Sequence, residues 1–395
     1  MISVPEARKI IQQHVTALQP VQMKLQDAAG YRLAVDIVSP LDIPAYPQSS
    51  MDGYAFSFSD WQQNPELLVQ GEMAAGSRSQ LEIQPETAVR IFTGAPVPYG
   101  ADTVVMQEKT SVTNHHLQIH DEQLKQGANV RLQGSEIKKG ELALTANATL
   151  TPAAMGFLAG MGITDVMVFP PPAVTIIITG NELQNPGQPL AYGQVYDSNS
   201  FALTAALQQN GIRQIKVVTV PDVLDQLTDA LQQALELSDL VLLTGGVSVG
   251  DYDFVLEAAT RCGITTRFHK IKQRPGKPLF FGTEASKLVF GLPGNPSSVL
   301  TCFYMYVLPA IIAMSGKQYG LSEKQVPLSK SYRKAAGLTH FLKGYYDGNT
   351  VLPLGAQESY RMRSFAAANC LIELEEQVTD CIEGTMVNIH LLPVE

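Results

Sequence analysis

The most informative segment for the fold is Thr244-Gly245-Gly246-Val247-Ser248-Val249-Gly250-Asp251-Tyr252-Asp253, which lies between a strand pattern and a helix pattern. The apolar run 240–243 before it is typical of a strand buried on both faces, and residues 254–261 after it predict a helix. A glycine-rich turn at this junction exposes backbone N–H groups beside the positive end of a helix, and so forms an anion site. The carboxylates Asp251 and Asp253 beside it indicate a bound cation, most often Mg²⁺. The alternative interpretation is a tight turn in which Asp253 only caps the helix.

A second turn of this kind, Gly291-Leu292-Pro293-Gly294-Asn295-Pro296, follows the apolar residues 288–290. Pro296 suits the first position of a long apolar helix, and Asn295 suits its N-cap. Between the two turns, residues 267–277 carry five Lys or Arg side chains and no acid, in a chain of net charge -9. A charged run is usually a solvated face, but this run lies between two phosphate-type turns, and its Pro-Gly pair fixes where Lys277 points. The pattern therefore favours an anionic ligand that carries phosphates.

The whole chain has the composition of a globular protein with several domains. Its 395 residues are too many for one core, so about two to four domains are expected. There is no apolar N-terminal run to predict a signal peptide, and the apolar stretch 303–314 is too short to span a bilayer, so it predicts a buried helix. Four scattered cysteines predict reduced thiols in a cytoplasmic protein without a membrane partner. The acidic balance argues against a nucleic-acid partner.

Strand and helix patterns alternate from residue 173 onward, which predicts a three-layer α/β domain with a largely parallel sheet. The expected strands are 174–179, 215–219, 239–243, 279–281 and 288–290, and the expected helices are 200–209, 223–236, 254–261 and 297–314. Functional loops of such a sheet lie at the carboxyl ends of its strands. The segment Thr179-Gly180-Asn181-Glu182-Leu183, Asp222 and the two glycine turns should therefore meet in one crevice.

The rest of the chain predicts smaller domains around this one. Residues 46–140 have short β-type runs and predict a β-rich inserted subdomain, flanked by a linking subdomain of residues 1–45 plus 141–170. The α/β domain is expected to cover residues 171–317. Residues 318–395 lack a long helical pattern and predict a small C-terminal β-barrel. His115, His116 and His120 have no acid or cysteine at ligand spacing, so a metal site there is not expected.

Several short motifs, in this order along the chain, resemble the MoeA family of molybdopterin molybdenumtransferases. They are Ser50-Met51-Asp52-Gly53-Tyr54-Ala55, Phe92-Thr93-Gly94-Ala95, Thr179-Gly180-Asn181-Glu182-Leu183, Tyr196-Asp197-Ser198-Asn199, Gly245-Gly246-Val247-Ser248-Val249-Gly250, Pro275-Gly276-Lys277-Pro278 and Gly291-Leu292-Pro293-Gly294-Asn295-Pro296. The resemblance covers essentially the whole chain.

The resemblance implies a reaction, an assembly and a cofactor. Members of this family use molybdate and adenylylated molybdopterin as substrates and release AMP and molybdenum cofactor, with Mg²⁺ as the usual cation. They are elongated homodimers, and their cleft lies where the α/β domain of one chain meets the β-rich subdomain of the partner chain. A molybdopterin adenylyltransferase is then the expected upstream donor.

The resemblance also assigns site residues. The positions expected to be catalytic are Asp52, Thr93, Glu182, Asp222, Asp253, Lys270, Arg274 and Lys277. Those expected to bind substrate are Gly180, Asp197, Asn199, Gly245, Gly246, Ser248, Gly250, Pro293, Gly294, Asn295, Pro296 and Ser364. The expected ligands of Mg²⁺ are Asp253, Asp222 and Glu182, and Lys270 with Ser364 could line the molybdate seat.

The chain departs from the family pattern at two positions. The family often has lysine where this chain has Arg274, which keeps the charge and can grip phosphate bidentately. It often has paired acids where this chain has Pro221-Asp222, which weakens the assignment of Asp222.

Two alternative functions remain open. They are molybdopterin adenylylation, which uses a similar α/β domain, and a non-enzymatic molybdopterin-binding scaffold. Additional subdomains on both sides of the α/β domain argue against the adenylylation reaction.

Overall fold

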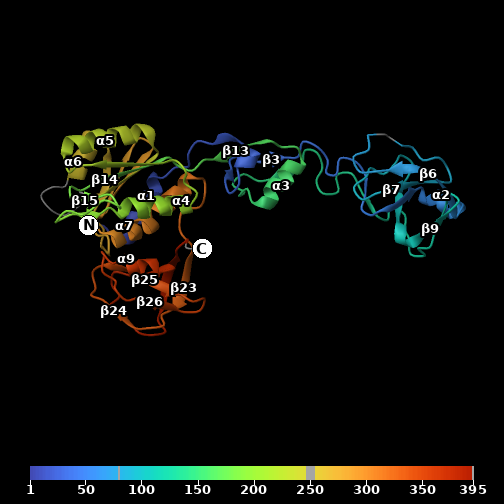
Figure 1. Ribbon diagram of the computed structural model, residues 1–395. Coiled ribbons are helices and arrows are strands. Elements are labelled where there is room, and N and C mark those ends of the chain that lie inside the picture. Colours follow the sequence, from blue (N-terminus) through green and yellow to red (C-terminus); the bar gives the residue numbers. More distant parts are fainter. Residues whose placement is uncertain (79–80, 246–253, 394–395) are drawn as a thin grey trace. The chain divides into compact units, whose positions relative to one another are not determined.

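The computed structural model describes residues 1–78, 81–245 and 254–393 (Figure 1). The chain divides into a first unit, residues 1–21 with 168–395, and a second unit, residues 22–167. Most of the glycine-rich turn that follows Gly245 is outside the described residues. The predictions made for Gly246, Ser248, Gly250, Asp251 and Asp253 therefore lie outside them too.

A six-stranded sheet forms the centre of the first unit, in the order β17-β14-β18-β22-β21-β19. Its strands are β14 (Val174–Thr179), β17 (Ile215–Val220), β18 (Leu240–Thr244), β19 (Thr265–His269), β21 (Phe280–Glu284) and β22 (Lys287–Leu292). The first four in spatial order are parallel, with Ile176 opposite both Val217 and Leu242. The other two are antiparallel, so the predicted, largely parallel sheet is confirmed.

Helices cover both faces of this sheet, as Figure 1 shows. Helices α5 (Leu224–Leu237) and α6 (Phe254–Arg261) pack on the face that carries Ile177 and Leu243. Helices α1 (Val4–His14), α4 (Asn199–Gln209) and α7 (Pro296–Cys302) pack on the opposite face. Because alternate residues of each strand are buried against a different helix layer, the strands have continuous apolar runs. The predicted three-layer α/β fold is thus confirmed.

The N-terminal helix departs from the expected domain division. Residues 1–45 were assigned to the linking subdomain, but α1 belongs to the first unit. The reason is its apolar face, since Val4, Ala7 and Ile11 are fully buried in the core of that unit. Its N-cap follows the sequence, with the Ser3 hydroxyl accepting from Glu6 N.

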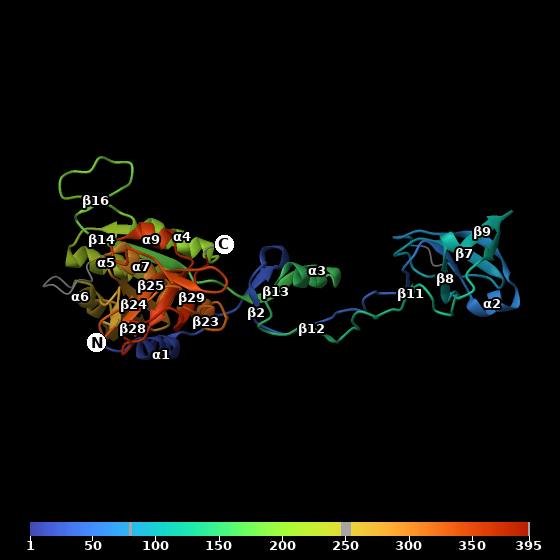
Figure 2. The same cartoon turned by 90° about the horizontal axis from the view of Figure 1, so that it is seen from below.

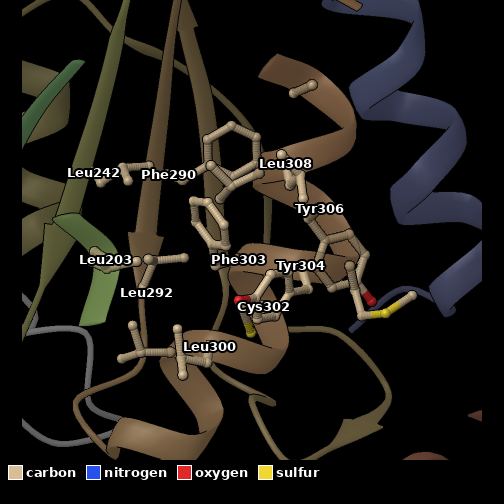
Figure 3. Packing of buried hydrophobic residues seen from close by; sticks show 14 of the residues in the cluster. Leu203, Leu242, Phe290, Leu292, Leu300, Cys302, Phe303, Tyr304, Tyr306 and Leu308 are labelled. Atoms are coloured by element: carbon tan, nitrogen blue, oxygen red, sulfur yellow. The ribbon is translucent and has the colours of Figure 1, made fainter. Parts of the chain in front are cut away.

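One long apolar helix lies at the middle of the first unit. It runs from Pro296 to Met314 as α7, a π-helical turn at Phe303–Val307 and α8 (Leu308–Met314). It begins before the apolar stretch 303–314, so by length and composition it could cross a membrane, but 89% of it is buried inside the protein. Figure 3 shows Leu300, Cys302 and Phe303 of this helix packed beside Phe290 and Leu292 of the sheet. Its burial marks it as the core helix that the sequence predicts.

The C-terminal residues form β structure, as predicted, but they share their sheet with the α/β region. The strands β23 (Glu323–Pro327), β25 (Thr339–Tyr346), β27 (Cys370–Leu374) and β29 (Met386–Leu391) are joined by β26 (Val351–Pro353) on β25. The strand β20 (Gln273–Arg274) of the cationic segment completes the sheet by pairing in parallel with β25. Strands β24 (Tyr332–Arg333) and β28 (Asp380–Cys381) pair separately, and α9 (Met362–Ala366) is a short helix.

The second unit contains a six-stranded sheet in the order β8-β5-β7-β6-β10-β9. Its strands are β5 (Gly53–Phe56), β6 (Glu66–Met73), β7 (Thr87–Ile91), β8 (Thr103–Met106), β9 (Thr110–Thr113) and β10 (His116–Ile119), with α2 (Phe58–Gln63) beside them. Two antiparallel pairs, β3 (Ile37–Val38) with β12 (Leu142–Leu144) and β4 (Gln48–Ser49) with β11 (Val130–Arg131), hold the entering and leaving segments together. The six-stranded sheet is therefore an insertion, and the chain segments that enter and leave it are paired with each other.

The linking region contains the remaining elements of the second unit. Strands β1 (Val21–Lys24), β13 (Asp165–Phe169) and β2 (Arg32–Leu33) form a three-stranded sheet beside α3 (Pro152–Gly160). Thr151 caps α3 by accepting from Ala154 N, and Pro152 occupies its first turn, as the sequence predicts.

A buried ion network ties α1 to the C-terminal sheet. Arg8 donates through both terminal nitrogens to Glu373, at 2.9 and 3.4 Å, and His390 Nε2 lies 2.6 Å from the same carboxylate. Burial raises the pKa of the Glu373 carboxyl, but the hydrogen bond from His390 and the charge of Arg8 more than offset burial, so the pKa lies below its usual value. The Glu373 carboxylate thus depends on the Arg8 guanidinium and on the hydrogen bond with His390.

We predict that Arg8→Met destabilises the first unit by about 3–5 kcal/mol in denaturant unfolding at pH 7, because it removes one partner of a buried carboxylate. The matched control is Arg333→Met, which breaks an exposed pair with Asp380 and should cost less than about 1 kcal/mol. The folded-state pKa of Glu373 is depressed, so its contribution is lost as the pH falls through that value. The difference between wild type and Arg8→Met should shrink below about pH 4. Equal losses for the two variants would contradict the network.

Candidate active site

A cleft of about 960 Å³ opens at the carboxyl ends of β14, β18 and β22 in the first unit. Ligands bind at this edge in open α/β sheets, because the loops that leave parallel strands converge there. Predicted site residues that line the cleft are Glu182, Asp197, Asn199, Gly245, Arg274, Lys277, Pro293, Gly294, Asn295 and Pro296. Residues from five separate predicted motifs are therefore brought together, whereas Asp222, which the crevice argument included, is not part of the lining.

Asn199, at the start of α4, fastens two edges of the cleft. Its Nδ2 donates to Thr244 Oγ1 at 3.0 Å and to the carbonyl of Gly294 at 2.8 Å. The end of β18 is thereby tied to the turn that follows β22. Its Oδ1 is buried and has no hydrogen-bond partner among the residues that the structure describes. An acceptor of this kind suits a ligand that brings an N–H or O–H donor.

The acids of the cleft differ in how far they are already engaged. Asp197 accepts from Ser200 N and Oγ, and so caps the start of α4. Asp222 is outside the cleft lining and accepts from Thr179 Oγ1 and Asn181 N, beside Gly180. Glu182 lines the cleft, and its carboxylate has no partner in the described part of the chain.

These acids give a partial fit to a divalent cation. Carboxylate oxygens are the ligands that Mg²⁺ prefers, and the Glu182 carboxylate is open to the cleft. In the described ranges 1–78, 81–245 and 254–393, no three His, Cys, Asp or Glu residues come close enough to hold a metal among themselves. A cation there would need phosphate oxygens of the substrate, water, or residues outside those ranges to complete its shell.

The cationic wall of the cleft comes from the turn after β20. Arg274 and Lys277 both line the cleft, and neither makes an ion pair within the described residues. Gly276 between them has φ of 86°, and a Cβ there would lie 2.5 Å from Cys302 Sγ. Only glycine fits this position, so the turn that aims Lys277 is sterically fixed. Lys270 lies outside the cleft lining, at a left-handed position with φ of 76°.

The C-terminal sheet supplies a wall that the sequence analysis missed. Residues 357–360 line the cleft, and their loop folds around the buried ammonium of Lys343. Lys343 Nζ donates to the carbonyls of Ala356, Glu358 and Arg361 at 2.8, 3.4 and 3.2 Å. Burial lowers the pKa of Lys343. A lysine inside the apolar run 341–346 was the available signal, since lysine is rarely fully buried without partners.

Contacts on the far side of this loop reach the second glycine turn. Asn295 was expected to cap the apolar helix with its side chain, and it does occupy the N-cap position. Its Nδ2, however, donates to Ser359 Oγ at 3.0 Å, and Ser297 N donates to the carbonyl of Ser359. The Ser364 hydroxyl donates to the carbonyls of Ala356 and Arg361, so it supports the loop and does not line the cleft.

A second cleft of about 530 Å³ shares Arg274 and Pro275 with the first. Lys334 and His340 line it, both nearly fully buried. Burial, with the charges of Lys334 and Arg274, lowers the pKa of His340 to about 4, so this imidazole is neutral at pH 7. The positive charge of this cleft lining is thus carried by Arg274, Arg333 and Lys334.

Asp52 and Thr93 form a pair in the second unit. Asp52 Oδ1 accepts from Thr93 N at 2.7 Å and from Thr93 Oγ1 at 2.8 Å. These hydrogen bonds, the backbone one foremost, lower the pKa of the exposed Asp52 carboxyl. Two of the motifs quoted from the sequence therefore meet here, and the hydrogen bonds hold Asp52 as a carboxylate at neutral pH.

A three-layer α/β fold with a cation-lined cleft at its strand ends is typical of proteins that bind phosphate-bearing ligands. Comparison with known families gives the same class with more detail. Residues 2–162 match the MoeA N-terminal region (domain I and II), residues 175–313 match the probable molybdopterin binding domain, and residues 325–392 match the MoeA C-terminal region (domain IV).

Relatives and solved structures align over nearly the full length. The chain is 35% identical over 404 residues to a molybdopterin molybdenumtransferase of Haemophilus influenzae, covering 99% of this chain and 100% of the relative. It is 33% identical to a molybdopterin molybdenumtransferase 2 of Mycobacterium tuberculosis, covering 98% and 99%. A crystal structure of the molybdopterin biosynthesis MoeA protein from Pyrococcus horikoshii superposes with a TM-score of 0.86 at 28% identity, covering 99% of each chain. The chain belongs to the MoeA family.

We predict that Gly276→Ala costs about 1–3 kcal/mol of stability, because the added methyl must displace Cys302 or Gln273 at a left-handed position. Gly355→Ala is the control, since a Cβ there meets no atom within 4 Å. Thermal unfolding of both variants tests this. A Gly276→Ala protein as stable as Gly355→Ala would show that the turn can relax freely.

Proposed function

We propose that this protein inserts molybdenum from molybdate into adenylylated molybdopterin, releasing AMP and molybdenum cofactor. The observation that carries the proposal is the pair Arg274 and Lys277, two cations that line a cleft at the carboxyl ends of parallel strands and make no ion pair within the described residues. Both side chains are exposed and line the cleft, so they are available to an anion, and two cations suit the linked phosphates of an adenylylated ligand. The names of the relatives support the same substrate class.

The chain's own residues then have separate tasks. Arg274 and Lys277 bind and orient the phosphates, and Asn199 Oδ1 accepts from a donor on the ligand. Glu182 also lines the cleft and could hold Mg²⁺, with Asp222 and Asp253 as further candidate ligands. When bound, Mg²⁺ would neutralise phosphate charge during cleavage of the pyrophosphate linkage. Such cleavage needs positioning and charge stabilisation more than covalent chemistry by the protein.

Molybdate is itself an anion and needs a cationic seat. The sequence suggests Lys270 and Ser364 for this seat. Lys270, however, lies outside the cleft lining, and the Ser364 hydroxyl is bound to backbone carbonyls. Arg274 is the better candidate, since it lines both clefts without an ion pair in the described residues. The protein is further proposed to be a cytoplasmic homodimer that receives its substrate from a molybdopterin adenylyltransferase.

We predict that Lys277→Ala weakens binding of adenylylated molybdopterin by about 1.5–3 kcal/mol, the range for a hydrogen bond to a charged group. Calorimetry measures the binding, and AMP release with and without molybdate measures turnover. Lys324→Ala, which removes a lysine outside both clefts, is the control. Unchanged affinity in Lys277→Ala would remove Lys277 from the phosphate site. AMP release that ignores molybdate would argue against insertion, and AMP transfer to molybdopterin would favour the adenylyltransferase alternative.

A second prediction tests whether two chains build each site. If Asp52 of one chain acts at the cleft of the other, Asp52→Ala and Lys277→Ala homodimers should both have low turnover at limiting substrate. Mixed dimers carry one site with both lesions and one with neither, so they should regain about half of the wild-type activity per dimer. Heterodimers confirmed by mass that regain nothing would show that each site belongs to one chain.

A further inference from the structure

The turn that carries Lys277 is held from inside by one buried side chain, that of Gln273. Gln273 is 1% exposed, and its Nε2 donates to the carbonyls of Pro275 and Gly276 at 3.0 and 3.1 Å. These are the two residues between Arg274 and Lys277. A single amide group thus fixes both main-chain carbonyls of the turn, which in a buried position need a donor.

The direction of this amide follows from its surroundings. The two carbonyls can only accept, so the NH₂ group of Gln273 must face them and Oε1 must face away. Oε1 accepts from the hydroxyl of Tyr306, which is fully buried. Burial raises the pKa of Tyr306 well above its usual value, so the hydroxyl keeps the proton that it donates. Every polar group of the Gln273 side chain is therefore engaged in one orientation.

Tyr306 lies in the π-helical turn Phe303–Val307 of the central helix. A π-turn adds a residue to the helical repeat and changes which side chains face a neighbouring element, and such turns recur at functional sites. Cys302 precedes this π-helical turn and packs against the turn that carries Lys277, with its Sγ 3.5 Å from Gln273 Nε2. Figure 3 shows Cys302 and Tyr306 on successive turns of this helix.

The remaining side of the turn is closed by main-chain bonds. Ile271 N and Leu279 N both donate to the carbonyl of Lys277, at 2.9 and 3.1 Å. Gly276 has no room for a Cβ, because the Gln273 amide and Cys302 occupy that space. The main chain of the turn is fixed on both sides, while the exposed Lys277 side chain makes no ion pair in the part of the chain that the structure describes.

We infer that Gln273, oriented by Tyr306, is a positioning residue that holds the main chain of the turn from which Arg274 and Lys277 reach the phosphates. The inference rests on the proposed function, since it assigns those cations to the phosphates. Neither Gln273 nor Tyr306 touches the ligand: Gln273 acts through the carbonyls of Pro275 and Gly276, and Tyr306 acts through Gln273. The central helix thereby sets the geometry of the cationic wall.

The test uses the full-length protein and inorganic pyrophosphate as the probe, with affinity measured by calorimetry. Gln273→Met keeps the side-chain length and removes all its hydrogen bonds, so affinity should fall about tenfold. Tyr306→Phe should weaken binding by a smaller factor. The double variant should bind no more weakly than Gln273→Met alone, because Tyr306 acts only through Gln273.

The matched control is Tyr319→Phe. The Tyr319 hydroxyl is buried, has no hydrogen-bond partner within the described residues and lies outside both clefts. Thermal unfolding of Tyr306→Phe and Tyr319→Phe reports the loss of stability, and a purely structural role for Tyr306 would lower the melting temperature without weakening pyrophosphate binding. If Gln273→Met does not fold, the comparison of these two tyrosine variants decides.

Two failures can be told apart. If wild type binds pyrophosphate, Lys277→Ala does not, and Gln273→Met and Tyr306→Phe both bind within twofold of wild type, the positioning inference is wrong and the proposed function stands. Fully additive losses in the double variant would likewise overturn the inference. If wild type does not bind pyrophosphate, or Lys277→Ala binds it equally well, the phosphate role of the turn fails and the proposed function fails with it.

Discussion

The burial of the apolar helix 296–314 is the constraint on which the first unit depends. A helix that is apolar on all sides must be covered on all sides, and no single layer can do this. The sheet covers one side through Phe290 and Leu292, while Ile11 of α1 and Phe341 and Phe365 of the C-terminal region cover others. Three segments far apart in sequence are therefore held in one core, and the loops between them meet at the cleft.

The packing around the central helix decides which segments line the cleft. Its floor is made by the ends of parallel strands, which Asn199 ties together. Its walls come from the turn after β20 and from residues 357–360, which are brought near by the pairing of β20 with β25 and by the contact of Asn295 with Ser359. The loop that carries β16 (Val195–Tyr196), paired with β15 (Leu183–Gln184), projects from the first unit in Figure 2, and Val195 and Tyr196 line the cleft. A site of this kind can form only after the C-terminal sheet has docked.

The sequence was sufficient for the parts of this arrangement that depend on local pattern. Buried strands such as 174–179 and the glycine turns at their ends predict both the α/β layer and the edge where the cleft lies. The pairing of a two-residue strand at 273–274 with β25 left no local signal, because it depends on contacts across more than sixty residues of chain. The engagement of Asp222 and Ser364 with backbone and hydroxyl groups also depends on tertiary placement, so carrying family roles over by position could not show it.

The loop around Lys343 has a consequence for how this enzyme family can diversify. The ammonium recognises three main-chain carbonyls, so the shape of the loop is specified by backbone atoms and one cation. Glu358 pairs with Arg361, and Arg361 lies over the Tyr360 ring, but these contacts are solvent-exposed and weaker than the buried bonds of Lys343. The side chains of Glu358 and Tyr360 both line the cleft. Substitutions there can alter the surface offered to a ligand while the fold of the loop is retained. The protein could thus change which oxyanion it prefers by substitutions at these two positions, without a change in the main chain of the loop.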